Sequence, residues 1–386
     1  MKKILFVLQS PQSGGSTTSM LNLIGFLDKD KVKADIFFLE RNGTFLEKAK
    51  ELADVLPEER IVSSITCKVE DLKKRGIISG LIRLVYVFVH KIFGKERAFE
   101  IFYAKSVKRL PKDYDAVIAY QEAKVTEYLK TYKGAQRIAW VHCDYDRFKL
   151  NHTEQFEQNL YNHYDDIVCV SEYAKTTMKE NLNLDDDHLH VIYNTIDVQK
   201  IRALASEQIQ IKTGKITFVS VGRFVPIKAF DRAVEVAELL KKDGIEFVWH
   251  LIGDGEDLPK VMDCVRQKKL EDCIIFHGNQ KNPYQYMKQA DYYICTSICE
   301  THPMVALEAL ALGLPVISTS YPSTSEVILD GYNGVIVPNT SIGIYQGIKK
   351  VLGDKEFSNA IHEKVHDYVY DNQKSVNTFY KVLNIN

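Results

Sequence analysis

One strand–helix–strand unit in the second half of the chain decides the fold; it reads YYICTSICETHPMVALEALALGLPVIS over residues 292–318. Both ends of this stretch are short apolar runs, which are typical of strands buried on both faces of a parallel sheet. Between them, Pro303 suits the first position of a helix, Gly313 suits its C-terminal cap, and Pro315 prevents continuation. The stretch therefore predicts a helix of about ten residues that begins just after Glu300 and connects two parallel strands.

The same alternation of apolar runs and helical patterns extends over most of the chain. Strands are predicted in both halves, at residues 3–8, 34–39, 116–120, 137–141, 167–170, 190–192, 216–221, 247–252, 274–277, 292–296, 316–318 and 334–337. Because strands that alternate with helices form parallel sheets, the pattern predicts an α/β fold with two doubly wound, Rossmann-like domains. We expect the boundary in a polar stretch near residues 200–212, with domains at 1–205 and 206–368.

The composition limits the classes of function. The chain has 386 residues, and 50 Lys and Arg against 51 Asp and Glu give a formal charge of −1. Since nucleic-acid-binding domains are strongly basic, a nucleic acid is not expected as partner. The seven cysteines form no C-x-x-C pair, as expected for reduced thiols in the cytoplasm. No apolar stretch is long enough to cross a bilayer, and the run after Met1 is predicted to be a strand instead of a signal peptide.

The segment 68–109 departs from the alternation. It carries eleven Lys and Arg against four acidic residues, and residues 77–93 within it are apolar at 12 of 17 positions. A basic amphipathic helix of this kind can lie in the headgroup plane of an anionic membrane. It can equally be a core helix of the first domain with solvated basic ends, and the sequence leaves both interpretations open.

Two loops that follow predicted strands carry residues suited to a phosphate ligand. Gly14 and Gly15 come after the first strand, where paired glycines let the backbone approach a ligand and the next helix offers free N–H groups. After the strand at 216–221, Arg223 and Lys228 lie five residues apart on a kinked loop, a spacing that allows them to clamp a diphosphate. A plain turn and two solvated charges are the alternatives.

The helix predicted after Glu300 gives the most specific signal. Its first amides, at Met304 and Val305, lack helical acceptors and favour negative charge. Glu308 lies on an otherwise apolar helix, where a carboxylate is costly unless it binds a ligand. A pair of sugar hydroxyls is a natural partner, because an ionised carboxylate accepts hydrogen bonds well. The alternative is two acids at an accidental spacing.

The order of these residues resembles that of family 4 of the retaining glycosyltransferases, over nearly the whole chain. The likeness rests on Gly14-Gly15, Asn194-Thr195-Ile196-Asp197, Gly222-Arg223 with Lys228, Gly253-Asp254-Gly255, Glu300-x7-Glu308, Pro315-Val316-Ile317-Ser318 and Glu326 with Gly331-Tyr332-Asn333-Gly334. The resemblance implies the GT-B fold, with two Rossmann-like domains that face a central cleft and a last helical segment, 369–386, that packs back across both. The chain departs from the family pattern at Thr301-His302, often Gly-Phe, and at Ala229, often Gly.

The resemblance also implies roles for residues of the second domain. Arg223 and Lys228 would hold the donor diphosphate, and Glu300 would contact the transferred sugar. Glu308 would bind the ribose hydroxyls of the nucleotide. The backbone contributors to donor binding would be Gly15, Gly253, Met304 and Val305.

Polar residues at the carboxyl ends of strands in the first domain mark the acceptor side. His142 resembles the family's acceptor-side histidine, and a histidine there can hydrogen-bond the acceptor or the transferred sugar. A structural histidine with satisfied hydrogen bonds is the alternative. Gln121 and Glu122 are further candidates for the acceptor pocket. The expected catalytic residues are His142, Arg223, Lys228 and Glu300.

The function implied by the resemblance is retaining transfer of a hexose from a UDP- or GDP-sugar to a lipid-linked or saccharide acceptor. The expected setting is synthesis of bacterial surface polysaccharide such as capsule, in the cytoplasm or peripheral on the inner face of the membrane. We expect no cofactor and no metal, because the cations of the clamp neutralise the leaving diphosphate. A nucleotide-sugar epimerase or hydrolase of the same fold, or a non-catalytic partner subunit, stays open as an alternative.

Overall fold

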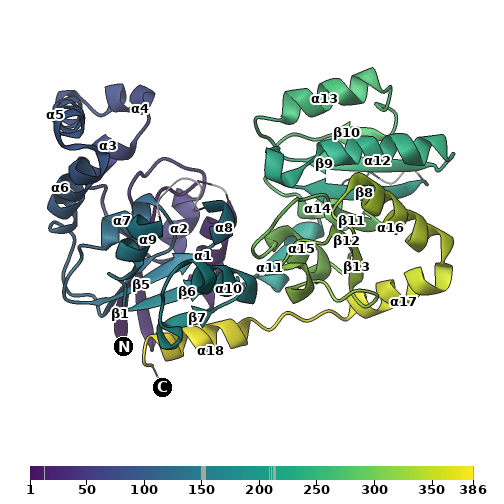
Figure 1. Ribbon diagram of the computed structural model, residues 1–386. Coiled ribbons are helices and arrows are strands. Elements are labelled where there is room, and N and C mark those ends of the chain that lie inside the picture. Colours follow the sequence, from purple (N-terminus) through teal and green to yellow (C-terminus); the bar gives the residue numbers. More distant parts are fainter. Residues whose placement is uncertain (13, 149–153, 208, 210, 212–213, 386) are drawn as a thin grey trace. The chain divides into compact units, whose positions relative to one another are not determined.

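The computed structural model describes residues 1–12, 14–148, 154–207, 209, 211 and 214–385 (Figure 1). This described part forms two compact units, the first made of residues 1–195 and 372–386 and the second of residues 196–371. Each unit contains one parallel β-sheet covered by helices. The predicted α/β class with two Rossmann-like, doubly wound domains is confirmed.

The boundary between the two units lies ten residues before the expected boundary at 205/206. The reason is that α11 (Val198–Ala205) packs against α14 (Tyr284–Met287) and α15 (Met304–Ala311), so it belongs to the second unit. Asn282 adds a hydrogen bond, since its Nδ2 donates to the Leu204 carbonyl at 2.9 Å. Part of the polar stretch expected as the boundary lies outside the described residues, namely 208, 210 and 212–213.

The first unit contains a seven-stranded sheet in the order β3-β2-β1-β4-β5-β6-β7. Its strands are Lys2–Leu8 (β1), Val32–Phe38 (β2), Asp54–Val55 (β3), Ala116–Ala119 (β4), Gln136–Val141 (β5), Asp166–Cys169 (β6) and Leu189–Val191 (β7). β3 was not predicted, because its two residues are too short to form an apolar run. The helices are Gly15–Phe26 (α1), Leu46–Leu52 (α2), Arg60–Thr66 (α3), Val69–Lys74 (α4), Ile77–Phe93 (α5), Lys95–Val107 (α6), Lys124–Leu129 (α7), Tyr145–Phe148 (α8), Glu154–Tyr161 (α9), Glu172–Asn181 (α10), Asp186–His188 (η2) and Asn372–Val382 (α18).

The last helix, α18, belongs to the first unit. Phe379 of α18 is fully buried, with its ring centroid 6.1 Å from that of Phe6 on β1 and 5.7 Å from that of Trp140 on β5. A buried aromatic ring of this kind contributes about 3–5 kcal/mol relative to alanine. Along the sequence, the chain therefore returns to the first unit after the last residue of the second.

The second unit contains a six-stranded sheet in the order β10-β9-β8-β11-β12-β13. Its strands are Ile216–Val221 (β8), Phe247–Ile252 (β9), Ile274–Phe276 (β10), Tyr292–Cys295 (β11), Val316–Thr319 (β12) and Gly334–Val337 (β13). Besides α11, α14 and α15, its helices are Pro226–Lys228 (η3), Asp231–Lys242 (α12), Leu258–Gln267 (α13), Thr324–Glu326 (η4), Ser341–Gly353 (α16) and Lys355–His366 (α17).

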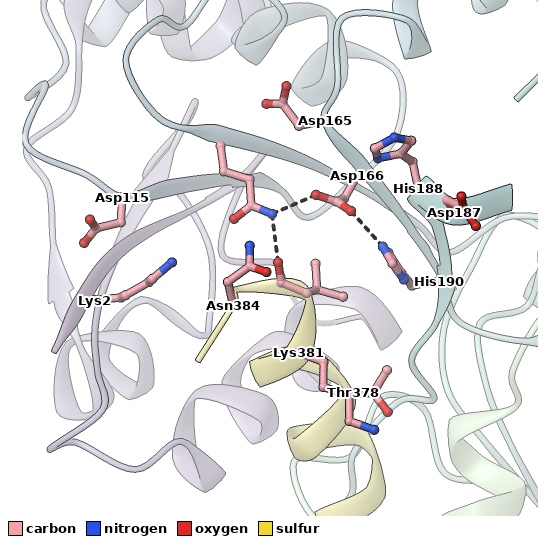
Figure 2. A pocket seen from close by; sticks show the side chains of 12 residues that line it. Lys2, Asp115, Asp165, Asp166, Asp187, His188, His190, Thr378, Lys381 and Asn384 are labelled. Atoms are coloured by element: carbon pink, nitrogen blue, oxygen red, sulfur yellow. Dashed lines mark hydrogen bonds and ion pairs between the residues drawn. The ribbon is translucent and has the colours of Figure 1, made fainter. Parts of the chain in front are cut away.

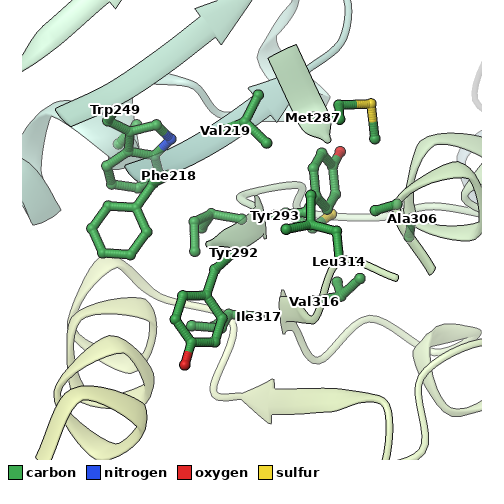
Figure 3. Packing of buried hydrophobic residues seen from close by; sticks show 14 of the residues in the cluster. Phe218, Val219, Trp249, Met287, Tyr292, Tyr293, Ala306, Leu314, Val316 and Ile317 are labelled. Carbon is green, nitrogen blue, oxygen red and sulfur yellow. The ribbon is translucent and has the colours of Figure 1, made fainter. Parts of the chain in front are cut away.

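The core of the second unit explains why its strands read as continuous apolar runs. Figure 3 shows Phe218 of β8 beside Trp249 of β9, with ring centroids 5.6 Å apart. The indole Nε1 of Trp249 donates to Ser220 Oγ at 3.0 Å, and this hydroxyl donates to the Ile294 carbonyl at 2.6 Å. Because covered strands need apolar side chains on both faces, only such satisfied polar groups are tolerated between them.

Both sheets have a topological switch point. β1 lies between β2 and β4, and β8 lies between β9 and β11, so the connections leave these central strands on opposite sides. At such a point the loops after the carboxyl ends of the strands leave a crevice, where ligands of open α/β sheets bind. The loops after β8 and β11 carry Arg223, Lys228 and Glu300, and those after β4 and β5 carry Gln121, Glu122 and His142.

Candidate functional site

The loops after β8 and β11 bring Lys228 and Glu300 together. Lys228 Nζ forms an ion pair and hydrogen bond with Glu300 Oε1. Ser297, which the sequence analysis did not select, donates from Oγ to the same carboxylate oxygen at 2.6 Å. Both charged side chains are partly accessible to solvent. A cation and a carboxylate with fixed positions can therefore meet a ligand at this edge of the sheet.

The loop that carries Lys228 is held by main-chain contacts. Thr296 Oγ1 donates to the Lys228 carbonyl at 2.7 Å, and the Ile298 amide donates to the Ile227 carbonyl at 2.8 Å. Directly after η3, Ala229 adopts a left-handed conformation with φ of 47°. Glycine occupies such a conformation without strain, which accounts for the glycine that the family often has at this position.

Arg223 is exposed, and within the described residues its side chain forms no hydrogen bond or ion pair. The structure therefore does not join it to the Lys228–Glu300 pair, and its role stays a prediction. A different arginine supports the loop: Arg232 Nη1 donates to the Thr296 carbonyl at 3.1 Å and to Asn339 Oδ1 at 2.6 Å. Asn339 Nδ2 in turn donates to the Ile298 carbonyl at 2.8 Å. No local pattern predicts these contacts, because they join segments far apart in the sequence.

Gly253 is required by the close approach of two loops. Its φ is 141°, and a Cβ at this position would lie 1.8 Å from the carbonyl oxygen of Gly222. The amide of Gly222 donates to the Ile252 carbonyl at 3.0 Å, and that of Gly253 donates to the Gly278 carbonyl at 2.8 Å. The glycine thus lets the ends of β8 and β9 meet beside Arg223.

The helix α15 is shorter than predicted, with eight residues, and Pro303 is its N-cap instead of its first residue. No side chain caps this end, so its first amides point out of the helix without helical acceptors. Glu308 of α15 is 8% exposed, and Tyr284 OH donates to its Oε1 at 3.1 Å. Burial and the adjacent Glu308 carboxylate raise the pKa of Tyr284, so the phenol remains a donor. Tyr284 was not selected from the sequence, because it is 24 residues away on another helix.

Two of the residues at which the chain departs from the family pattern, Thr301 and His302, directly follow Glu300. His302 is buried, and burial lowers its pKa to about 3, which keeps the imidazole neutral. Next to it, the carbonyl of Glu300 accepts a hydrogen bond of 2.7 Å from Ser323 Oγ, a fully buried hydroxyl. A neutral ring therefore replaces the apolar side chain that the family often has here.

In the first unit, Glu122 holds the backbone after β5. Its Oε1 accepts hydrogen bonds from the amides of His142 and Cys143, the latter at 2.6 Å. Burial raises the pKa of this carboxyl group. The His142 ring lies 5.0 Å from that of Tyr120. The structure thus gives Glu122 a positioning contact with His142, while an acceptor contact stays a prediction for both.

Gln121 joins two further segments of the same edge. Its Oε1 accepts from the Gln9 amide at 3.1 Å, and its Nε2 donates to Ser16 Oγ at 3.1 Å. Gly15 is the first residue of α1 and is exposed, and no side chain caps this helix. Ser13, in the same loop, lies outside the described residues.

A hollow of about 670 Å³ lies at the opposite edge of the first sheet (Figure 2). There Asp166 accepts hydrogen bonds from Gln136 Nε2 and His190 Nε2, both at 2.7 Å. Because these groups satisfy one another and lie at the amino ends of the strands, the hollow is not a candidate for the ligand crevice. Within the described ranges, no group of three His, Cys, Asp or Glu side chains could hold a metal ion.

Comparisons with known proteins show what the chain is similar to. The chain is similar to the N-acetylgalactosamine-N,N'-diacetylbacillosaminyl-diphospho-undecaprenol 4-alpha-N-acetylgalactosaminyltransferase of Campylobacter jejuni, 27% identical over 207 residues, 53% of this chain and 55% of that protein. It is 25% identical to the lipopolysaccharide 1,6-galactosyltransferase of Salmonella typhimurium over 241 residues, 61% of this chain and 64% of that protein. The alignments thus span little more than half the length of these curated relatives.

Solved structures show the fold. The crystal structure of HepE from Anabaena in complex with UDP and glucose matches with a TM-score of 0.74 at 16% identity and covers 100% of both chains. That of TarM matches with a TM-score of 0.73 at 14% identity and covers 100% of this chain and 99% of the other. The predicted GT-B fold, with two Rossmann-like domains, is therefore confirmed.

Two family models together cover nearly the whole chain. The model of Glycosyltransferase Family 4 matches residues 13–200, and that of Glycosyl transferases group 1 matches residues 202–367. With these matches, the chain belongs to glycosyltransferase family 4.

Proposed function

We propose that the protein is a retaining, metal-independent hexosyltransferase that uses a nucleoside diphosphate sugar, with UDP or GDP as carrier. The observation that carries the proposal is the Lys228–Glu300 pair beside the uncapped start of α15, with Glu308 one turn into that helix. A cation, free amides and two carboxylates match the diphosphate, sugar and ribose of such a donor. HepE, of the same fold, was solved with UDP and glucose.

Each group has a distinct role in the proposed donor complex. The diphosphate replaces Glu300 as the partner of Lys228, and Arg223 reaches it from the exposed loop. Glu300, released from Lys228 and still held by Ser297, accepts hydrogen bonds from the sugar hydroxyls. Glu308, oriented by Tyr284, accepts from the two ribose hydroxyls. The amides of Met304 and Val305 complete the site.

The proposed reaction breaks the bond between the anomeric carbon and the diphosphate oxygen. The acceptor hydroxyl forms the new bond on the same face of the sugar, and the leaving phosphate takes its proton. Lys228, Arg223 and the start of α15 stabilise the charge that grows on the leaving group. Since these groups supply positive potential, we propose that neither a metal ion nor a cofactor is needed, and that activity persists in excess chelator.

For the acceptor we propose a lipid-linked or saccharide molecule of bacterial surface polysaccharide synthesis. The support is that the relatives in Campylobacter jejuni and Salmonella typhimurium carry names with a diphospho-undecaprenol and a lipopolysaccharide acceptor. His142, whose amide donates to Glu122, is the proposed acceptor-side residue, and Gln121 is a further candidate. For the location we propose the cytoplasm, peripheral on the inner face of the membrane.

A thermal-shift panel of nucleoside diphosphates and their sugars tests the donor assignment. We expect one carrier to raise the melting temperature, because a ligand that binds only the folded state stabilises it. Glu308→Ala should lose most of that shift, whereas Glu356→Ala, an exposed acid of α17 in the same unit, should keep it. An unchanged shift in Glu308→Ala contradicts the ribose assignment, and no shift with any carrier favours a non-catalytic subunit.

A second measurement separates transfer from the other reactions of this fold. The donor is incubated with the protein, with and without a saccharide acceptor, and the sugar products are analysed. We expect transfer with retained anomeric configuration only when acceptor is present. Rapid release of free sugar or of an epimer without acceptor overturns the assignment in favour of a hydrolase or an epimerase.

A further inference from the structure

One helix of the first unit exposes an unusual number of large apolar side chains. Within the described residues, eighteen large apolar side chains are exposed, and nine of these belong to the 17 residues of α5. Ile77 is 85% exposed, Leu84 68% and Phe88 63%. Single exposed apolar residues are ordinary, but a contiguous apolar patch marks an interaction surface. The interpretation of residues 77–93 as a core helix therefore does not hold.

The inner side of α5 is packed, so the helix is held with its apolar face outward. Ser79 and Tyr86 are buried, and the Tyr86 ring lies 5.5 Å from those of Phe99 and Phe102 on α6. Arg83 donates through Nη1 to the Ile65 carbonyl at the end of α3. Figure 1 shows α5 at the outer side of the first unit, beside α3, α4 and α6.

The exposed apolar residues share one side of the helix. At about 100° per residue, most of them fall within one half of the circumference, opposite to Ser79, Arg83 and Tyr86. We call this surface the outer face of α5; its residues are Ile77, Ile78, Leu81, Leu84, Val85, Val87, Phe88 and Ile92. A half-circumference of Ile, Leu, Val and Phe is wider than the seam that a single partner helix covers.

The segment that contains the outer face is rich in positive charge. α5 contains no acidic residue, and segment 68–109 has an excess of seven basic over acidic residues. Lys68, Lys73 and Lys91 are exposed, and in the described part of the chain none of them forms an ion pair. At about 100° per residue, Lys91 lies on the same side of α5 as the outer face. An apolar stripe in a segment rich in exposed lysines matches the acyl chains and phosphates at the surface of an anionic bilayer.

We propose that the outer face of α5 is an interfacial membrane anchor that lies in the headgroup plane of an anionic phospholipid bilayer, with Lys73 and Lys91 on lipid phosphates. Within the residues that the structure describes, no helix has the length and apolarity needed to cross a membrane. The proposed anchor goes beyond the transfer reaction and does not depend on the sugar or the acceptor.

Flotation of the full chain with phosphatidylcholine vesicles, with and without 30% phosphatidylglycerol, tests the proposal. We expect flotation with the anionic vesicles and little with the neutral ones. Lys73→Glu with Lys91→Glu should reduce partitioning by more than about 30-fold, since the loss of each basic residue near such a surface removes about a five-fold factor and each new carboxylate is repelled by the lipid phosphates. The matched control is Lys260→Glu with Lys281→Glu, at lysines of the second unit. Equal binding to neutral and anionic vesicles overturns the proposal.

A second pair of variants tests the apolar face. Leu81→Gln with Phe88→Gln should abolish flotation, whereas Leu329→Gln with Ile342→Gln, similarly exposed in the second unit, should not change it. The nucleotide thermal shift should be the same in all variants, which separates this proposal from that of the donor site. Light scattering tests whether a second copy of the chain covers the outer face instead. The anchor is overturned if the wild type does not float with vesicles and forms a dimer that Leu81→Gln with Phe88→Gln makes monomeric.

Discussion

The two units use the same sheet topology but treat the acids near the ligand edge in opposite ways. In the second unit, Glu300 stays partly accessible and pairs with Lys228, and Tyr284 orients Glu308. In the first unit, Glu122 is turned inward onto backbone amides, and burial raises its pKa. Glu157 of α9 is also buried. The same fold can therefore place a carboxylate either to meet a ligand or to hold its own loops.

The largest expected effect concerns the cation of the second unit. Lys228→Ala should lower kcat/KM by about 10²–10³-fold, because the growing charge on the leaving diphosphate loses a positioned cation. The melting temperature of the free protein should change little, since the pair is partly exposed and such pairs contribute about 1 kcal/mol or less. Steady-state kinetics check this prediction, with Lys260→Ala as the control variant. A loss of stability without a loss of activity would contradict it.

The first unit should show the reverse pattern, with an effect on stability alone. Burial, and then the charges of Glu127 and Glu122, raise the pKa of Glu157 from 4.5 to about 7. A carboxyl group whose pKa is higher in the folded than in the unfolded protein makes its full contribution to stability below its unfolded pKa. This contribution is lost as the pH rises towards 7, because the buried group then has to ionise. The free energy of unfolding should thus fall by up to about 3 kcal/mol between pH 4.5 and 7. Glu157→Gln should remove the part of this dependence that Glu157 contributes and stabilise the protein at pH 8.

The two tryptophans allow this effect to be assigned to one unit, because Trp140 lies in the first and Trp249 in the second. In a Trp249→Phe background, urea unfolding followed by fluorescence reports on the first unit. Glu51→Gln, at an exposed acid of α2, is the control. If the stability of the wild type and of Glu157→Gln changes equally between pH 4.5 and 7, Glu157 does not carry a raised pKa.

A smaller effect is expected at Tyr284, and it tests whether the second unit orients its acids for a ligand. Tyr284→Phe removes the hydrogen bond to Glu308, which is worth about 1 kcal/mol, so the KM for the donor should rise about five-fold with kcat nearly unchanged. The control is Tyr345→Phe, because Tyr345 OH donates to Asp243 at 2.5 Å elsewhere in this unit. An unchanged KM means that Glu308 does not bind the nucleotide.

The sequence was sufficient for the fold because the apolar runs of buried strands are local signals. Among the strands of the described residues, only β3 was not predicted, since its two residues are too few to form an apolar run. At the site, Lys228, Glu300 and Glu308 were found from their positions after strands and on an apolar helix, whereas Ser297 and Tyr284 were not. These two act through hydrogen bonds between segments that only the fold brings together. For α5 the apolar pattern showed a face, but which side is covered depends on α3 and α6.

The smallest effect is expected at Ala229, where the second unit keeps a strained backbone next to its cation. An alanine in the left-handed region costs about 1 kcal/mol, while glycine loses up to about 1 kcal/mol through the entropy of the unfolded chain. Ala229→Gly should therefore stabilise the protein by less than about 1 kcal/mol and leave kcat unchanged. Ala229→Val, with a branched side chain at φ of 47°, should destabilise it by more. Thermal unfolding compares the two variants. Equal effects would mean that residue 229 does not keep the left-handed conformation and that this conformation does not fix the position of Lys228.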